Sequence, residues 1–270
     1  MVRRVRRKAP ARCGLGEKSE MISSETYLSA FGGFPLAASH VGIKTLWASE
    51  IEPFPMKVTM ERFPDMVHVG DITKLKGADL LPVDIICGGS PCQNLSVAGN
   101  RMGLEGSQSG LFYEMIRVIK ELRNADRERG RTAQSVRPRW SVWENVPGAY
   151  SSGEPPGEDF RIVLESFAGI SLGAVSIPRP ESGKWKSAGR ILLGDTFSLA
   201  WRTLDAQYWG VAQRRARVYL IVDFAGPCAP KILFDEAGLF GHTPPGEGEG
   251  QTSAAATGAG AEDTSWADTS

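Results

Sequence analysis

The sequence predicts an α/β fold built on a doubly wound, mostly parallel sheet with helices on both faces. Short apolar segments alternate with helical ones from residue 23 to residue 90, a pattern typical of parallel βαβ units. Each apolar segment ends in a polar or glycine-containing pair, as strands do at the open edge of such a sheet. The 270 residues are 41% hydrophobic and 23% charged, which is enough for one large domain with a core.

Apolar periodicity and turn residues locate the elements. Strands are expected at 44–48, 67–69, 83–87, 140–143 and 218–222. Helices are expected at 35–41, 53–62, 111–122, 160–167 and 197–204. The last of these helices is predicted because Asp195 and Thr196 precede it as candidate N-caps. Residues 147–159 are rich in Pro, Gly, Ser and Glu, so we expect a loop there.

Charge and composition divide the chain into three parts. Residues 1–22 are expected to form a flexible basic leader, because positions 3–12 hold six basic side chains and no acidic one. Residues 23–240 contain the predicted α/β domain. Residues 241–270 are mainly Gly, Ala, Thr, Pro and acid, so we expect a disordered acidic tail. The net charge of zero argues against a polycationic protein.

Several classes of protein are disfavoured. No apolar run is long enough to cross a membrane, and none follows the basic N-terminal residues as in a secretory signal. The four cysteines contain no Cys-x-x-Cys pair, and there are only three histidines, which argues against a zinc site and a disulfide-rich secreted domain. We therefore expect no metal, no membrane contact and a cytoplasmic location.

Successive strand ends carry residues suited to a nucleoside-type cofactor. Phe31, Gly32 and Gly33 would let the backbone approach a ligand at the start of a helix. Glu50 suits two ribose hydroxyls, and Asp71 suits an exocyclic amine. Each also has an ordinary interpretation, as a tight turn, a surface carboxylate or a helix cap. Their order at successive strand ends favours the cofactor site.

A cysteine stands just after the fourth predicted strand, in the segment Gly-Gly-Ser-Pro-Cys-Gln. On a turn shaped by glycine and proline, Cys92 is placed for nucleophilic attack at the open edge of the sheet. Cys87 lies within the apolar run and fits the other common role of a cysteine, that of a small buried hydrophobe. Residues 96–110 are a candidate loop that moves over a substrate.

Two more polar elements are placed to complete a site. Glu144 follows the tryptophan-rich strand, so its carboxylate is expected at the same sheet edge. Strand alternation would put Gln213, Arg215 and Arg217 on one face, as a compact fork of donors. The alternative for this second element is an ordinary basic surface patch.

In this order, the segments Phe-Gly-Gly-Phe, Ser-Glu, Gly-Asp, Ser-Pro-Cys-Gln, Glu-Asn-Val and Gln-Arg-Arg-x-Arg resemble a DNA (cytosine-5) methyltransferase of bacterial or phage type. The resemblance covers roughly residues 23–240 and is most distinctive at 88–101 and 208–220. It implies a Rossmann-like methyltransferase sheet, S-adenosylmethionine as cofactor and double-stranded DNA as substrate.

The resemblance also implies roles for single residues. Cys92 would attack carbon 6 of cytosine, and Glu144 would hold and protonate ring nitrogen 3. Arg217 would contact the carbonyl oxygen at position 2, supported by Arg215. The cofactor residues implied are Phe31, Gly32, Gly33, Glu50, Ile51, Asp71, Ile72, Pro91 and Leu111. The DNA-binding residues implied are Gln93, Ser96, Arg101 and Gln213.

Two features depart from the family pattern. Ala30 and Leu28 stand where the family has glycine and phenylalanine in the cofactor loop. After Arg217 the sequence shows neither the target-recognition region nor the closing segment usual in the family, and an acidic stretch follows instead. We therefore expect the catalytic part of such an enzyme: truncated, split between two chains, or decayed.

Three hypotheses remain. The first is a methyltransferase, either monomeric or completed by a second polypeptide that recognises the target sequence. The second is an inactive remnant with residual cofactor or DNA binding. The third is an unrelated cysteine hydrolase, disfavoured because His40 and His68 precede Cys92 at places that do not suit a histidine partner. The sequence does not separate restriction–modification from phage self-protection.

Overall fold

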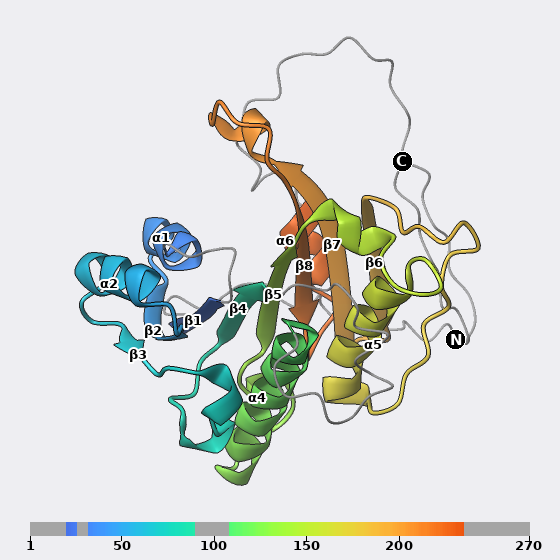
Figure 1. Ribbon diagram of the computed structural model, residues 1–270. Helices are drawn as coiled ribbons and strands as arrows, with labels where there is room; N and C mark the ends of the chain where they lie inside the picture. The colour runs from blue at the N-terminus through green and yellow to red at the C-terminus, as the bar shows by residue number, and fades with distance from the viewer. Residues whose placement is uncertain (1–19, 26–31, 90–107, 235–270) are drawn as a thin grey trace, which may run out of the picture.

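The computed structural model describes residues 20–25, 32–89 and 108–234. These residues form a fold built on one eight-stranded sheet (Figure 1). The strands are β1 (Glu20–Glu25), β2 (Lys44–Ser49), β3 (Val67–His68), β4 (Ile85–Gly89), β5 (Trp140–Asn145), β6 (Ala188–Leu193), β7 (Phe197–Asp205) and β8 (Ala216–Asp223). The helices are α1 (Gly33–His40), α2 (Pro53–Arg62), α4 (Gln108–Glu128), α5 (Glu158–Leu172) and α6 (Ala229–Phe234). Short 3-10 turns are η1 (Ile72–Lys74), η2 (Gly77–Asp79), η3 (Ala133–Ser135), η4 (Pro147–Tyr150) and η5 (Ala206–Trp209).

The sheet has a parallel half and an antiparallel half. Its order is β3-β2-β1-β4-β5-β8-β7-β6, and neighbours are parallel from β3 to β5. β8 is antiparallel to both β5 and β7, and β6 is antiparallel to β7. β7 therefore runs in the direction of β5, so six of the eight strands point the same way. The predicted mostly parallel sheet is confirmed, and the carboxyl ends of β2 to β5 share one edge.

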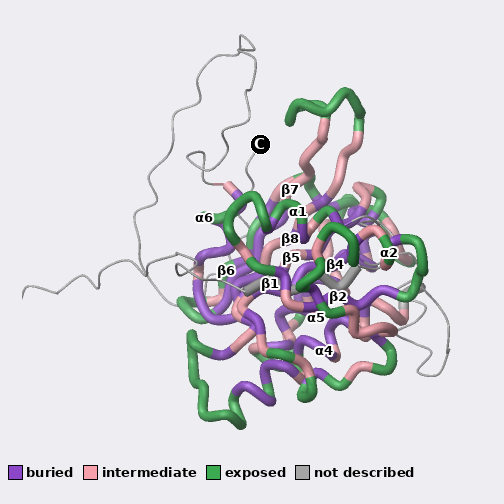
Figure 2. The backbone as a smooth tube through the Cα atoms, turned by 90° about the vertical axis from the view of Figure 1, so that its left-hand side faces the viewer, coloured by how far each residue is buried: buried purple, intermediate pink, exposed green. Residues whose placement is uncertain are grey.

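Helices cover both faces of the sheet, as predicted: α4 and α5 lie on one face, and α1 and α6 on the other (Figure 2). Alternate strand residues serve the two faces, because side chains in a strand point to opposite sides. On β4, Ile86 joins the larger core cluster with Phe112 of α4 and Phe160 of α5. Its neighbour Ile85 packs on the other face with Ala38 of α1.

The segment predicted as a helix at 197–204 is strand β7, which is a correction to the sequence analysis. It pairs with β6 on one side and β8 on the other, so its backbone bonds lie between strands. Phe197 and Leu199 belong to the larger cluster, whereas Ala200 packs under α6 on the opposite face. Asp195 and Thr196, the supposed caps, lie in the turn between β6 and β7.

Two strands were not predicted. β1 begins at Glu20, within the segment expected to be a leader, and it lies between β2 and β4 in the parallel half. Its sequence, Glu-Met-Ile-Ser-Ser-Glu, has only two apolar residues and hence little strand signal. β6, the edge strand of the antiparallel half, was also not predicted.

The basic run at 120–139 is partly built into the fold. Arg137 pairs with Asp126 at 3.0 Å, and Arg139 pairs with Asp223 at 3.1 Å, both carboxylates being fully buried. Arg123 is also buried and donates to backbone carbonyls just before β5. Removing one partner of a buried pair costs about 3–5 kcal/mol. These three arginines are structural and lie away from the carboxyl ends of the parallel strands.

None of the described helices combines the length and apolar character that crossing a membrane requires. Within the described ranges, no three His, Cys, Asp or Glu side chains are grouped so as to hold a metal ion.

Candidate active site

Glu50 follows β2 at the carboxyl edge of the sheet and is buried. Its Oε1 accepts hydrogen bonds from the backbone N–H groups of Ile51 at 2.7 Å and Glu52 at 2.9 Å, where the chain turns into α2. These bonds fix the carboxylate. No donor among the described residues reaches its Oε2, so this oxygen is available to a ligand hydroxyl.

Asp71 lies beside the end of β2, because the Ser49 hydroxyl donates to the carbonyl of Gly70 at 2.6 Å. The Asp71 Oδ1 accepts from the backbone N–H of Thr73 at 2.9 Å and from its hydroxyl at 2.8 Å, capping η1. The backbone hydrogen bond and then the hydroxyl bond hold the pKa of Asp71 below its ordinary value. The carboxylate is therefore ionised and suited to accept from an amine.

Arg117 of α4 holds the turn that carries Asp71. Its guanidinium donates to the carbonyls of Ile72 at 2.9 Å and Leu75 at 2.7 Å. Ile72 is buried in the larger core cluster, and Leu111 on the first turn of α4 packs half-buried against the same cluster. The structure thus brings three of the predicted cofactor residues to one part of the sheet edge.

Gly32 caps α1 in the left-handed region, with φ of 81°. A Cβ on it would lie 2.9 Å from the ring of Phe63 and 3.2 Å from the methyl group of Thr59, so α2 leaves room only for glycine. Gly33 begins the helix. Ile51 is exposed next to Glu50 and adds apolar surface at this edge.

β5 and β8 bring a carboxylate and an arginine together at the same edge. Glu144 lies opposite Tyr219, and Arg217 stands two residues before Tyr219 on the same strand face. Arg217 Nε is 3.1 Å from Glu144 Oε1. The Glu144 residue is only 7% exposed, so the pair is largely shielded from water.

Burial raises the pKa of Glu144, and the charges of Arg217 and Arg215 only partly oppose this shift. Glu144 therefore keeps its proton to higher pH than a solvated glutamate. The buried N–H at Arg217 Nε makes no aligned hydrogen bond with any described residue in spite of the short ion-pair distance.

Gly89, the last residue of β4, packs directly against Glu144. A Cβ on Gly89 would lie 2.9 Å from the Glu144 backbone oxygen and 3.1 Å from its Oε2. A side chain here would therefore displace the carboxylate or separate β4 from β5.

The remaining predicted donors lie in the loop that joins β7 to β8. Arg215 precedes β8, and its backbone N–H donates to Asp205 Oδ1 at 2.9 Å. Gln213 lies in an exposed bend before the strand begins at Ala216. The predicted strand alternation therefore does not reach Gln213. The prediction that Gln213 shares one strand face with Arg215 and Arg217 was wrong.

A family model described as "C-5 cytosine-specific DNA methylase" matches residues 27–173. The chain belongs to this methylase family. The matched segment spans both Glu50 and Glu144, the carboxylates that the fold places at the carboxyl edge.

Curated relatives of this methylase are longer proteins. A protein of Escherichia phage P1 named DNA N-6-adenine-methyltransferase is 34% identical over 225 residues. The match covers 76% of this chain and 29% of the relative. Type II methyltransferase M.NlaIV of Neisseria lactamica is 27% identical, and the match covers 67% of this chain and 34% of the relative. Type II methyltransferase M.MspI of Moraxella is 26% identical, and the match covers 81% of this chain and 45% of the relative. The chain thus spans less than half the length of these relatives.

The fold has a counterpart of known structure. The crystal structure of S. pombe Dnmt2 methyltransferase superposes with a TM-score of 0.52, covering 85% of this chain and 57% of the other. At 18% identity, this likeness supports the fold alone.

Six of the predicted site residues of this methylase lie outside the described residues: Phe31, Pro91, Cys92, Gln93, Ser96 and Arg101. Cys87 lies inside β4 and is buried in the core, and burial raises the pKa of its thiol. This agrees with its predicted structural role, because a reactive cysteine needs an accessible thiolate.

Three residues that position side chains of the candidate site were not predicted: Gly89, Arg117 and Asp205. Gly89 ends an apolar run in a glycine pair, a signal of close backbone approach. Arg117 pairs with Glu114 and Glu121 on α4, a spacing that alone indicates an ordinary helix surface. Asp205 carried no signal, because its strand was predicted as a helix.

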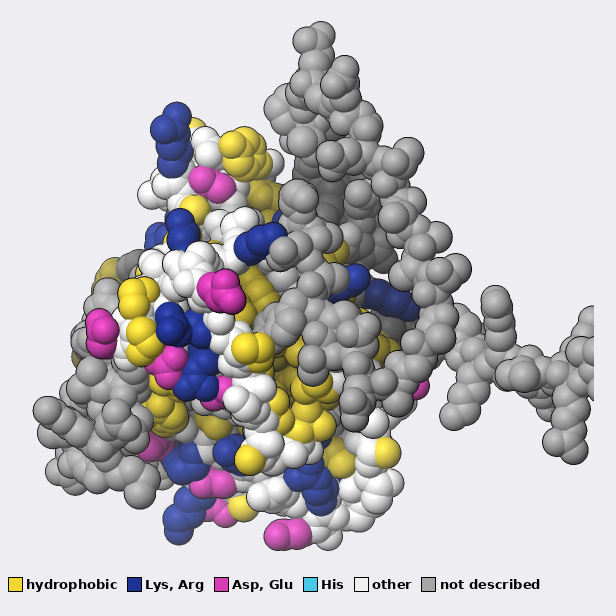
Figure 3. Space-filling model, turned by 90° about the vertical axis from the view of Figure 1, so that its right-hand side faces the viewer, with side chains coloured by type: hydrophobic (Ala, Val, Ile, Leu, Met, Phe, Trp, Pro, Cys, Tyr) yellow, Lys and Arg dark blue, Asp and Glu magenta, His cyan; other side chains and the backbone are white. Residues whose placement is uncertain are grey.

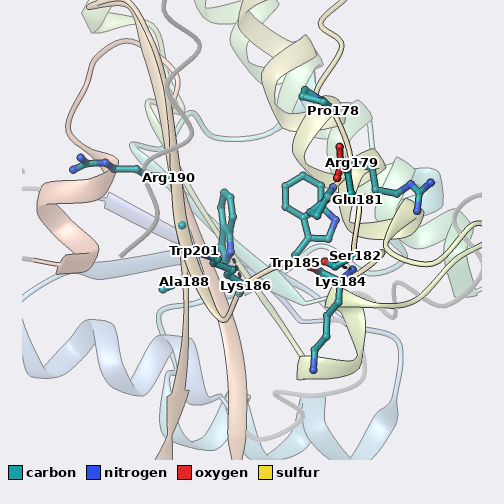
Figure 4. Close-up of a pocket in the computed structure, with 12 residues that line it drawn as sticks. Pro178, Arg179, Glu181, Ser182, Lys184, Trp185, Lys186, Ala188, Arg190 and Trp201 are labelled. Atoms are coloured by element: carbon teal, nitrogen blue, oxygen red, sulfur yellow. Dashed lines mark hydrogen bonds between the residues drawn. The ribbon is translucent and has the colours of Figure 1, made fainter. Parts of the chain in front are cut away.

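A cavity of about 350 Å³ lies apart from the methylase site, beside β6 and β7 (Figure 4). Trp185 and Trp201 form its aromatic walls, and their indole N–H groups already donate to backbone carbonyls. The guanidinium groups of Arg179 and Arg190 point away from it (Figure 4). None of the predicted site residues lines this cavity.

Proposed function

We propose that this chain transfers a methyl group from S-adenosylmethionine to carbon 5 of cytosine in double-stranded DNA. The observation that carries the proposal is the buried Glu144–Arg217 pair at the carboxyl edge of the sheet. Cys92 follows Gly89 by three residues, so covalent geometry keeps its Cα within about 11 Å of Gly89, which contacts Glu144. Membership of the methylase family supports the same reaction.

The proposed chemistry begins with activation of the ring, because carbon 5 of cytosine is a poor nucleophile. The Cys92 thiolate adds to carbon 6, forming an S–C bond and moving the electron pair of the C5–C6 double bond into the ring. The proton on Glu144 goes to ring nitrogen 3, and the Arg217 guanidinium donates to the oxygen at position 2. Both interactions offset the negative charge that develops on the ring.

Carbon 5 then forms its bond to the methyl group. When bound, S-adenosylmethionine supplies this methyl as an electrophile attached to a sulfonium. The proton on carbon 5 leaves to water, its electron pair re-forms the C5–C6 double bond, and the thiolate departs from carbon 6. Ring nitrogen 3 returns its proton to Glu144. Cys92 is thereby regenerated, and the two-step addition and elimination replaces one difficult direct substitution.

The described residues fit this cofactor. Glu50 presents Oε2 to a ribose hydroxyl, and the ionised Asp71 is suited to the amine of adenine. Gly32 has no side chain at the start of α1, and Ile51 offers an apolar contact. We assign Phe31, Gly33, Ile72, Pro91 and Leu111 to the same site.

The cytosine has to leave the duplex to reach Glu144 and Arg217, since its ring carbons are stacked inside the helix; extrusion costs a few kcal/mol. We assign the DNA contacts that accompany extrusion to Gln93, Ser96, Arg101 and Gln213.

We propose that residues 23–240, together with the start of β1, form the catalytic unit, and that a second polypeptide supplies recognition of the target sequence. The family-model match at residues 27–173 lies within the proposed catalytic unit and supports that part of the proposal. The alternative is an inactive remnant that retains cofactor or DNA binding. We place the activity in the cytoplasm of a bacterium or of a phage-infected host, where the DNA substrate lies.

Methylation of the N6 amine of adenine is a second candidate, because the phage P1 relative carries that name. An exocyclic amine has its own lone pair and needs no thiol addition to a ring. A buried carboxylate–arginine pair suits the pyrimidine ring better. Nucleoside analysis of methylated DNA separates the candidates, since the proposed reaction yields 5-methylcytosine and no N6-methyladenine.

Covalent trapping tests the proposal. In 5-fluorocytosine, fluorine replaces the proton that has to leave carbon 5, so the adduct cannot collapse. A pool of random-sequence duplexes containing 5-fluorocytosine, with S-adenosylmethionine, should form a covalent complex with the protein. Cys92→Ser should abolish it, whereas Cys87→Ala should retain it. Trapping that requires an added recognition polypeptide supports the split form. No adduct in either setting rules out the active enzyme and leaves the remnant.

A further inference from the structure

The hairpin of β7 and β8 projects beyond the rest of the sheet at the edge that carries the Glu144–Arg217 pair (Figures 1 and 2). Its tip exposes Tyr208 by 62%, Trp209 by 44% and Val211 by 50%. These three residues, called the tip patch, are large apolar side chains within four successive positions. Single exposed apolar residues are ordinary, but such a group on a projecting element indicates an interaction surface.

Hydrogen bonds hold the tip in shape. Asp205 Oδ1 accepts from the backbone N–H groups of Gln207 at 3.2 Å and Arg215 at 2.9 Å. Asp205 Oδ2 accepts from the Gln207 amide at 3.0 Å. The backbone N–H of Ala206 also donates to the carbonyl of Arg215 at 3.2 Å. These bonds hold the turn that carries the tip patch in one conformation. The turn therefore loses less conformational entropy when it contacts a partner.

Charge favours a negatively charged partner. Residues 205–217 contain three arginines and one acid, and Arg214 is exposed next to the tip patch. Figure 3 shows hydrophobic side chains and a basic one together at the projecting end. DNA offers phosphates for the arginines and flat base surfaces for aromatic rings. A second copy of the hairpin would instead oppose like charges.

The hairpin also has the right dimensions. The major groove of B-DNA is about 12 Å wide and admits a two-stranded β-ribbon. Trp209 lies five residues beyond Leu204, the partner of Arg217 in the ladder. The Cα of Trp209 is therefore within about 18 Å of the Cα of Leu204, which lies beside Arg217. At that distance the tip patch meets the duplex that flanks the target base.

We propose that the tip patch enters a groove of the DNA beside the extruded cytosine and places Tyr208 and Trp209 against the bases or sugars there. The inference rests on the proposed function and gives a substrate contact to three residues for which the family resemblance implied no role. The aromatic rings stabilise the opened duplex, while Arg214 contacts a phosphate.

The test compares DNA affinities of the full 270-residue chain and its variants on a random-sequence duplex pool. The Tyr208→Ser/Trp209→Ser double variant should bind about tenfold more weakly or worse, as expected from loss of aromatic–base contacts. Its salt slope should not change, whereas Arg214→Gln should lower the slope by about 0.9. Tyr208→Phe/Trp209→Phe should bind like wild type. Leu81→Ser removes a similarly exposed apolar residue ahead of β4, at the opposite edge, and should change nothing.

An affinity of the double serine variant within twofold of wild type would overturn the proposal, even if the wild-type chain still forms the Cys92 adduct. Wild-type protein that binds no DNA at all would overturn it as well. Loss of affinity in the serine variant with normal S-adenosylmethionine binding supports it, whether or not the trapping experiment succeeds. The two proposals can therefore fail separately.

Discussion

Two carboxylates at the same edge of the sheet have opposite surroundings. Asp71, in the parallel half, accepts two hydrogen bonds from Thr73, and these bonds lower its pKa. Glu144, on β5 at the border with the antiparallel half, is buried, and burial raises its pKa in spite of Arg217 and Arg215. One acid is held in its charged form and the other is biased toward its neutral form.

Under the proposed function, this difference would suit the two carboxyl groups to two tasks. A carboxylate that binds a cofactor has to remain an acceptor, which local backbone donors ensure. A carboxyl that gives a proton to a ring has to retain that proton near neutral pH, which burial favours. β8 pairs with β5 beside Glu144 and carries Arg217, and Arg215 directly precedes β8.

The largest expected effect is on the proton donor. Glu144→Gln preserves shape but cannot transfer a proton, so methyl transfer should fall by about 10²- to 10⁴-fold. S-adenosylmethionine affinity should stay unchanged, because Glu144 lies outside the cofactor residues. Steady-state methylation with tritiated cofactor, together with calorimetric binding, measures both. A loss of S-adenosylmethionine affinity as large as the loss of methyl transfer would contradict the separate roles of Glu144 and the cofactor residues.

The reciprocal change is in the parallel half. Glu50→Gln removes the charged acceptor for the ribose, so cofactor affinity should fall about 10- to 100-fold. Trapping of DNA at saturating cofactor should persist. Glu52→Gln, an exposed neighbour, serves as the control. A purely catalytic defect, with normal cofactor affinity, would remove Glu50 from the cofactor site.

Gly89→Ala tests the contact between β4 and the proton donor. The added Cβ would crowd the Glu144 backbone and carboxylate, so we expect about a tenfold loss of activity and about 1–3 kcal/mol of unfolding free energy. Gly148→Ala is the matched control, because its Cβ would meet nothing closer than 3.9 Å. Chemical denaturation and initial rates suffice. Equal tolerance of both substitutions would show that Gly89 does not fix Glu144.

The smallest effect is expected at Asp205, which positions the arginines indirectly. Asp205→Ala removes its bonds to the backbone of Gln207 and Arg215, so activity should fall a few-fold. Asp195→Ala, in the exposed turn between β6 and β7, is the control. The loss should appear in kcat while cofactor affinity stays constant; a change confined to cofactor affinity would contradict the positioning role.

The same contrast explains what the sequence predicted. In the parallel half, each strand ends in a polar signal, and topology brings strand ends together, so Glu50 and Asp71 were found from pattern alone. The antiparallel half depends on pairing between distant segments. Phe197 to Leu204 looked helical because Asp195 and Thr196 resemble caps, and only β6 and β8 on either side make it a strand.

Two features of the site were beyond sequence reasoning for a related reason. The crowding between Gly89 and Glu144 depends on the register of β4 and β5, which no local pattern encodes. The ion pair of Glu144 and Arg217 depends on the register of β5 and β8. Sequence order therefore predicted which groups belong to the site, whereas the electrostatics of Glu144 and Asp71 came from the fold.

Site-resolved carboxyl titration by NMR tests the central claim most directly, because it reports the two acids without DNA or a partner. The account predicts that Glu144 titrates above the ordinary value for glutamate and Asp71 below that for aspartate. Arg217→Gln should move Glu144 further upward, since it removes an opposing positive charge. A Glu144 that titrates at or below the ordinary value would contradict its role as the proton donor.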